Sequence, residues 1–134
     1  MTRQTDILKS PFPWFGGKSS IAAEVWRRFG NVPNYIEPFF GSGAVLLGRP
    51  LPFGGVETVN DKDGMVCNFW RAVKVDPEAV AFHADWPVLE NDLHARHAWL
   101  VGQKDSLQER LEGDFDFCDT QVAGWWCWGL ACWI

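Results

Sequence analysis

Apolar positions in the first half of the chain follow two different periods. Ile21, Val25 and Phe29 recur every fourth residue, which predicts one face of a helix. The β-branched run that begins at Val56 favours a strand, and clusters of glycine and proline separate such segments. The elements expected in chain order are a helix capped by Ser19 or Ser20 and ended by Gly30-Asn31, a strand Tyr35–Glu37, a short helix of about Ser42–Leu47, a strand Val56–Asn60, and a helix from Asp61–Asp63 through about Val73.

The second half of the chain is predicted to be mainly helical. Asp76-Pro77-Glu78 combines an N-cap, a proline at the first helical position and an early acid, which predicts a helix through about His83. Residues 88–112 favour a charged helix with leucines on its packing face, interrupted at Gly102. Residues 113–134 are acidic and then aromatic, and Trp125–Trp128 is compatible with a strand. Strand and helix alternate behind a leading helix, which argues for an α/β sandwich. Its core is expected to include Tyr35, Ile36 and Phe40.

Composition narrows the class of protein. The chain has 134 residues, 47% of them hydrophobic and 22% charged, which fits one globular domain with a real core. A net charge of −5 argues against a free-standing protein that coats DNA, so any contact with nucleic acid is expected to be local. The four cysteines lack metal-site spacing, and no run has the length of a membrane span or the pattern of a signal peptide. These features favour an intracellular protein with reduced thiols.

The tryptophans are unusual in number and place. There are nine, and four fall in the last ten residues, where the chain stops at Cys132-Trp133-Ile134. Because a natural C-terminus is usually polar and loosely held, this ending predicts a truncated coding sequence. The alternatives are that the segment packs as a closing strand or binds a partner chain.

A glycine turn offers the first candidate chemistry. The buried strand that ends at Glu37 is followed by Pro38-Phe39-Phe40-Gly41-Ser42-Gly43 and a helix start, the arrangement of a nucleotide-cofactor site in a Rossmann-like sheet. Leu46 stands where a third glycine would complete a dinucleotide fingerprint. Gly16-Gly17-Lys18-Ser19 suggests a phosphate loop, but Phe12 occupies the position where that motif needs a glycine.

Three motifs in order carry a family resemblance. They are Pro13-Trp14-Phe15-Gly16-Gly17-Lys18, then Glu37 through Gly43, then Asn60-Asp61-Lys62-Asp63. Asp61 follows Gly41 by twenty residues, the spacing of an acid that binds ribose hydroxyls. The set resembles the opening of the D12 class of DNA adenine-N6 methyltransferases, which includes the DNA adenine methylases. The resemblance covers residues 11–75 well, including Asn68-Phe69-Trp70, and residues 76–117 more weakly; residues 119–134 resemble phage-borne members.

The resemblance implies S-adenosyl-L-methionine as the cofactor and an incomplete Rossmann-like methyltransferase sandwich. Trp14 would attract the sulfonium, and Asp61 would accept hydrogen bonds from the ribose. Lys18 would neutralise the methionine carboxylate or the carboxylates around it, and Glu37 would hold the cofactor ammonium or brace the loop. The residues expected at the cofactor are Trp14, Gly16, Gly17, Lys18, Glu37, Pro38, Phe39, Gly41, Ser42, Gly43 and Asp61. No metal is implied.

The family's catalytic loop is missing from the sequence. Members methylate a flipped-out adenine with a [D/N/S]-P-P-[Y/F/W] tetrad, and the nearest string here, Asp76-Pro77-Glu78, lacks the second proline and the aromatic residue. No residue is therefore predicted to be catalytic. The resemblance divides the chain into a cofactor-binding half (1–75), a partial target-recognition region (76–117) and the start of a further aromatic segment (118–134).

The implied setting is the cytoplasm of a bacterium or of a phage-infected host, where the complete enzyme would act on double-stranded DNA, as restriction–modification enzymes do. Two alternatives stay open. One is a non-catalytic remnant that binds the cofactor, DNA or a partner chain. The other is an unrelated Rossmann-like nucleotide binder. The sequence gives neither the DNA target nor the oligomeric state.

Overall fold

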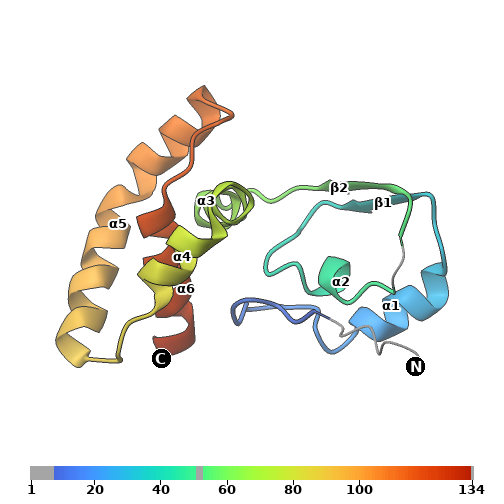
Figure 1. The fold of residues 1–134 in the computed structure, drawn as a ribbon, viewed down its shortest axis with the longest axis horizontal. Coiled ribbons are helices and arrows are strands. Elements are labelled where there is room, and N and C mark those ends of the chain that lie inside the picture. Colours follow the sequence, from blue (N-terminus) through green and yellow to red (C-terminus); the bar gives the residue numbers. More distant parts are fainter. Residues whose placement is uncertain (1–7, 51–52, 134) are drawn as a thin grey trace. The chain divides into compact units, whose positions relative to one another are not determined.

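The chain forms two compact units, one up to Asp61 and one from Lys62 onward (Figure 1). The computed structural model describes residues 8–50 and 53–133. The first unit carries both strands, and the second contains helices only in its described residues. The division predicted at residue 75 concerns function, and it stays a prediction.

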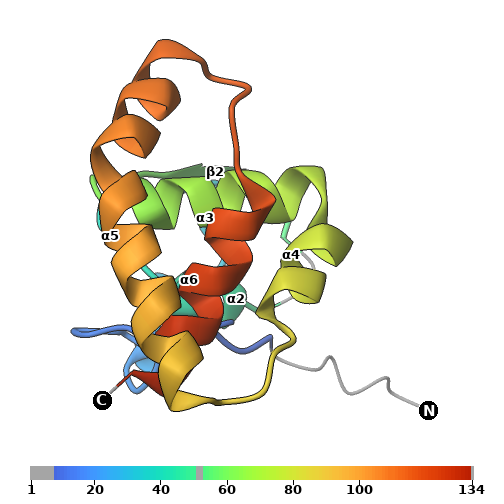
Figure 2. The ribbon, with the colours of Figure 1, turned by 90° about the vertical axis from the view of Figure 1, so that its left-hand side faces the viewer.

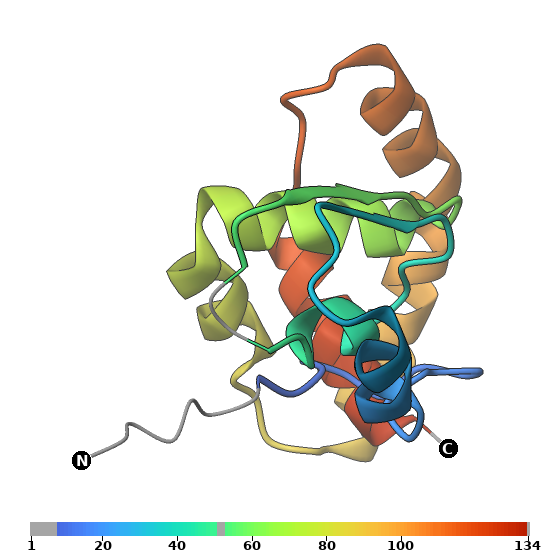
Figure 3. The ribbon, with the colours of Figure 1, turned by 90° about the vertical axis from the view of Figure 1, so that its right-hand side faces the viewer.

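The first unit is a small parallel sheet with two helices. β1 (Asn34–Glu37) pairs in parallel with β2 (Val56–Val59), with Ile36 opposite Thr58. α1 (Ala22–Phe29) and α2 (Ala44–Leu47) lie on the same side of the two strands (Figures 1 and 3). Helices and parallel strands in this order agree with the predicted α/β class.

Trp26 is the centre of the first unit's core. Its indole lies 4.9 Å from the ring of Tyr35, centroid to centroid, and its Nε1 donates to the carbonyl of Val45 at 2.7 Å. Phe40 is buried as predicted, but Ile36 is 70% exposed, so its placement in the core was wrong. Successive strand residues point to opposite faces, and only the face of Tyr35 is covered by the helices.

The sequence predicted the C-terminal end of α1 correctly but not its N-terminal end. Gly30 ends the helix with a φ of +62°, as expected for a glycine at this position. The predicted cap from Ser19 or Ser20 is wrong, because Ile21 occupies the N-cap position and no side chain caps the helix.

The second unit begins with two capped helices. Asp63 accepts hydrogen bonds from the backbone of Met65 and Val66 at the start of α3 (Gly64–Val75). Asp76 does the same for Ala79 at the start of α4 (Pro77–Ala84), where Pro77 stands in the first turn. Both starts agree with the predicted caps.

α6 (Thr120–Cys132) is the central helix of the second unit. It packs against α3, α4 and α5 (Glu90–Gly113), and Figure 2 shows it alongside α5. A strand over Trp125–Trp128 is therefore wrong. A helix buried on most sides has no polar stripe to reveal its period, and tryptophan is itself enriched in strands.

Two further features shape the second unit. α5 runs through Gly102 without interruption, contrary to expectation, because one exposed glycine costs a helix only about 1 kcal/mol.

The fully buried Asn68 of α3 holds the start of α6. Its Nδ2 donates to the Asp119 carbonyl at 2.9 Å, and its Oδ1 accepts from the Asp119 N–H at 2.7 Å.

Candidate cofactor site

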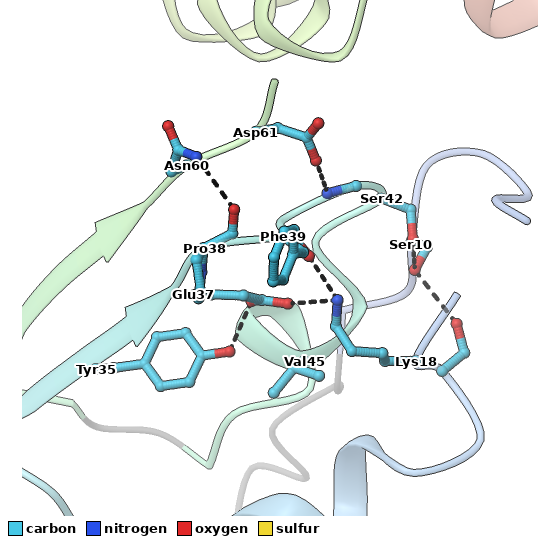
Figure 4. Close-up of polar contacts among 12 residues, drawn as sticks. Ser10, Lys18, Tyr35, Glu37, Pro38, Phe39, Ser42, Val45, Asn60 and Asp61 are labelled. Carbon is cyan, nitrogen blue, oxygen red and sulfur yellow. Dashed lines mark hydrogen bonds and ion pairs between the residues drawn. The ribbon is translucent and has the colours of Figure 1, made fainter. Parts of the chain in front are cut away.

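The glycine turn lies where the two strands end. Parallel strands bring their carboxyl ends to one edge of a sheet, so Glu37 and Asn60 become neighbours. The Asn60 N–H donates to the Glu37 carbonyl and the Phe40 N–H to the Asn60 carbonyl, both at 2.9 Å. The Asn60 Nδ2 donates to the Pro38 carbonyl at 3.2 Å (Figure 4). These bonds fix the path of the chain between β1 and the turn.

Asp61 closes the turn from the end of β2. Its Oδ2 accepts the Gly41 N–H at 2.7 Å across twenty residues (Figure 4). Gly41 and Gly43 have φ values of +53° and +69°, a backbone conformation that other residues adopt at a cost. The sequence motifs grouped Gly41, Gly43 and Asp61, and in the structure these three residues are neighbours.

Trp14 packs directly on the glycine turn. A Cβ built on Gly41 would lie 2.7 Å from both Cδ1 and Nε1 of the Trp14 indole, closer than real carbon atoms approach. Glycine at position 41 is therefore required by the ring as well as by the backbone. Trp14 is held in its own tight turn, in which the Gly17 N–H donates to the Trp14 carbonyl at 2.9 Å and Gly16 has a φ of +71°.

Lys18 braces the turn through its side chain. Its Nζ donates to the Phe39 carbonyl at 2.6 Å and lies 3.1 Å from Oε1 of Glu37 (Figure 4). Glu37 is buried, and its Oε2 accepts the Tyr35 hydroxyl at 2.6 Å. Lys18 therefore faces the Glu37 carboxylate beside the turn, while the roles predicted for this pair at a cofactor stay predictions.

The sequence missed Tyr35 as part of this network. Burial, followed by the hydrogen bond and the charge of Glu37, raises the pKa of the Tyr35 phenol well above its usual range, so the hydroxyl remains a donor. The available signal was the i, i+2 spacing of Tyr35 and Glu37, which places both side chains on one face of a strand. Taking Tyr35 only as a core residue overlooked its hydroxyl.

The remaining predicted residues border the turn. Ser42 is buried and its Oγ donates to Oγ of Ser10 at 3.2 Å, another contact that the motifs did not reveal. Phe39 is 79% exposed beside the turn. A hollow of about 520 Å³ is lined by Ser10, Phe12 and Ala44 among others. None of the eleven predicted cofactor residues lines it.

Within the described residues, no cluster of three or more histidine, cysteine, aspartate or glutamate side chains is arranged to hold a metal. None of the helices in that same part of the chain is long and apolar enough to cross a membrane.

The fold and the site define an α/β protein with a glycine turn at the carboxyl edge of a small parallel sheet. Comparison with known proteins gives the family. The model of the D12 class N6 adenine-specific DNA methyltransferases matches residues 14–98, and the chain belongs to this family. That match contains Trp14, the glycine turn and Asp61.

Curated relatives agree with the family assignment. The DNA adenine methylases of two strains of Vibrio cholerae serotype O1 are each 30% identical to this chain over 93 residues, which is 69% of this chain. The matched part is 31% of each relative, so the chain spans about a third of their length. No solved structure matches.

Proposed function

We propose that this chain binds S-adenosyl-L-methionine and is the cofactor-binding part of a DNA adenine-N6 methyltransferase of Rossmann-like fold. The observation that supports this most is the joining of Trp14, Gly41 and Asp61 into one rim, through the 2.7 Å hydrogen bond from Gly41 and the close packing of the indole. Family membership supports methyl transfer as the reaction.

The residues present fit the cofactor. The indole of Trp14 offers an apolar face to a sulfonium, and the left-handed turn at Gly41 and Gly43 lets backbone approach the methionine end. Asp61 uses one oxygen on Gly41, and a carboxylate has lone pairs enough to accept a ribose hydroxyl as well. When bound, the cofactor supplies an electrophilic methyl group.

The Lys18–Glu37–Tyr35 network gives the rim its rigidity. Lys18 ties the carbonyl of Phe39 to the buried Glu37, and Tyr35 fixes the other oxygen of that carboxylate. A rim held in this way loses little conformational entropy when a ligand arrives. We therefore assign Lys18 and Tyr35 to positioning, while Glu37 can also face the cofactor ammonium.

Methylation of adenine in double-stranded DNA is proposed for the protein of which these residues supply the cofactor site. The 134 residues contain no [D/N/S]-P-P-[Y/F/W] tetrad, so turnover is not assigned to them alone. In this proposal residues 1–75 hold the cofactor, residues 76–117 contribute to target recognition, residues 118–134 begin a further segment, and the protein works in the bacterial cytoplasm.

Calorimetry with S-adenosyl-homocysteine tests the cofactor site. We expect binding by the folded chain, and a loss of at least about tenfold in affinity for Asp61→Ala. Asp61→Asn is the matched variant, because its amide oxygen can still accept the Gly41 N–H and so separates support of the turn from the carboxylate's effect on the ligand. A folded chain that does not bind, or equal binding by wild type and Asp61→Ala, contradicts the assignment.

Two controls separate the remaining functions. Tighter binding of NAD or ATP than of S-adenosyl-homocysteine would indicate an unrelated nucleotide binder. A methyl-transfer assay on adenine-containing DNA tests the role of the tetrad, because activity from these residues alone would show that the tetrad is dispensable. The acidic balance of the chain and the missing tetrad favour a cofactor-binding module without turnover as the second candidate.

A further inference from the structure

A pocket walled by tryptophan lies within the second unit and contains none of the residues assigned to the cofactor. It has a volume of about 390 Å³ and is lined by Trp86, Asp92, Ala95, Arg96, Trp99 and Trp125. Four of these residues stand at helical spacing on one face of α5, which runs alongside α6 (Figure 2). The family match ends at residue 98, so Trp99 and Trp125 lie outside it.

Arg96, one of the lining residues, fills an aromatic cage formed by three tryptophans. Its guanidinium carbon lies 4.9, 4.5 and 4.7 Å from the ring centroids of Trp86, Trp125 and Trp128, and the residue is 9% exposed. Its Nη1 is buried without a hydrogen-bond partner in the described part of the chain. A cage of indoles suits a cation, and here the chain's own arginine already occupies it. An external cation is therefore not the ligand.

Asp92 provides a hydrogen-bond acceptor in the lining of the tryptophan pocket. Its Oδ2 accepts the Trp86 Nε1–H at 2.7 Å, which fixes the carboxylate against the indole. The residue is half-buried, and its second oxygen has no hydrogen bond within the described residues. The charge of Asp92 acts on the neighbouring Arg96 and offsets that of the guanidinium, so a free anion is also disfavoured here.

A neutral, planar ligand with an N–H donor suits both the indoles and the Asp92 carboxylate of this pocket. Trp86, Trp99 and Trp125 are partly exposed, and the parts of their indoles that Arg96 and the Trp99–Trp125 contact do not cover provide stacking surfaces. The volume falls within the usual range for small-molecule sites. A carboxylate accepts from an exocyclic amino group, as it does from the amino group of cytosine in base recognition. Stacking on aromatic side chains is the usual way in which proteins hold unpaired bases.

We propose that this pocket binds an unpaired nucleobase carrying an exocyclic amino group, stacked on the indoles and donating to Asp92. The base can come from a free nucleoside or from a single strand, and the chemistry is the same. The proposal does not rest on cofactor binding, because all six lining residues belong to the second unit.

Cytidine and uridine are the matched probes, since they differ chiefly in an amino group against a carbonyl at one ring position. We expect calorimetry on the full chain to show cytidine binding about tenfold tighter than uridine, the cost of leaving Asp92 facing a second acceptor. Asp92→Asn should remove or reverse that preference, because its amide N–H₂ donates to the uridine carbonyl while its oxygen still accepts from Trp86.

Ala95→Leu blocks the pocket at an exposed helical position with little risk to folding. Ala98→Leu is its control, since Ala98 is exposed on the same helix and does not line the pocket. We expect Ala95→Leu to weaken cytidine binding at least about tenfold and Ala98→Leu to leave it unchanged. Circular dichroism verifies that both variants are folded, and unchanged S-adenosyl-homocysteine titrations show that the other unit is unaffected.

A short oligo-deoxycytidine strand identifies the source of the base. Tighter binding of the strand than of cytidine, lost in Ala95→Leu, supports a base within single-stranded DNA. Binding of cytidine alone supports a free nucleoside. Three results overturn the proposal: no binding of either probe, equal affinity in Ala95→Leu and Ala98→Leu, or a cytidine preference that Asp92→Asn leaves intact. Loss of S-adenosyl-homocysteine binding would count against the proposed function only.

Discussion

Replacing Gly41 with alanine tests the packing of the indole on the glycine turn. Two costs add. An alanine at a φ of +53° costs about 1–2 kcal/mol relative to its preferred conformations. Its Cβ would also meet the Trp14 ring at 2.7 Å, and overpacking of this kind costs about 1–3 kcal/mol. The free energy of unfolding of the first unit should therefore fall by about 2–5 kcal/mol.

Gly16→Ala is the matched control for the backbone cost. Gly16 has a φ of +71°, and a Cβ built there meets no atom within 4 Å. The Gly16→Ala variant should therefore lose only the backbone part of the free energy of unfolding, about 1–2 kcal/mol. Urea titrations monitored by circular dichroism give both free energies of unfolding.

The double variant Gly41→Ala/Trp14→Leu isolates the contact with the ring. If the clash is real, the smaller leucine side chain makes room for the new methyl group, and the two substitutions together cost less than the sum of each alone by about 1–3 kcal/mol. Additive losses, or a Gly41→Ala variant no less stable than Gly16→Ala, would refute the indole packing described for this turn.

Three further outcomes are expected. Asn68→Ala should lower the free energy of unfolding by about 1–3 kcal/mol in urea titrations, because it removes the acceptor of the Asp119 N–H and leaves the Asp119 carbonyl with only the Ala123 N–H; a loss below about 0.5 kcal/mol would show that water replaces the amide. Tyr35→Phe should cost about 1–3 kcal/mol at pH 7 by leaving Glu37 short of a donor. The raised pKa of the Tyr35 phenol contributes stability that is complete below its unfolded value of about 10 and is lost as pH rises beyond it, so wild type should lose stability more steeply than Tyr35→Phe in alkaline titrations. Burial raises the pKa of the Cys127 thiol to about 11, so its alkylation at pH 8, followed by mass spectrometry, should be much slower than in urea-unfolded chain and should accelerate about tenfold per pH unit until that value.

The sequence predicted those parts of the fold that depend on neighbouring residues. Asp63 and Asp76 cap the helices that follow them, and Gly30 ends the first helix, because capping and backbone freedom act within a few residues. The motif spacing also grouped the glycine turn with Asp61, which accepts the Gly41 N–H in the structure, while their joint role at a cofactor stays a prediction.

The predictions were wrong where contacts between distant parts of the chain determine secondary structure or burial. α6 is covered on most sides by three other helices, so its sequence has no polar face to show a helical period. Ile36 is more apolar than Tyr35, yet it is the exposed one, because only the position of the helices decides which face of the sheet is covered. The cage around Arg96 joins a loop and two helices, a grouping that no local pattern could reveal.

The position of α6 has a consequence for how the second unit folds during synthesis. α3, α4 and α5 all leave the ribosome before α6, so the parts of their apolar faces that α6 covers have no partner until it emerges. The clamp between Asn68 and Asp119 joins residues 51 positions apart, and such long-range closure is slow compared with helix formation. The nascent unit should therefore pass through a stage of preformed helices with exposed apolar surface, when chaperones have most to bind. Translation speed over residues 114–132 should affect the yield of folded protein more than speed over α3.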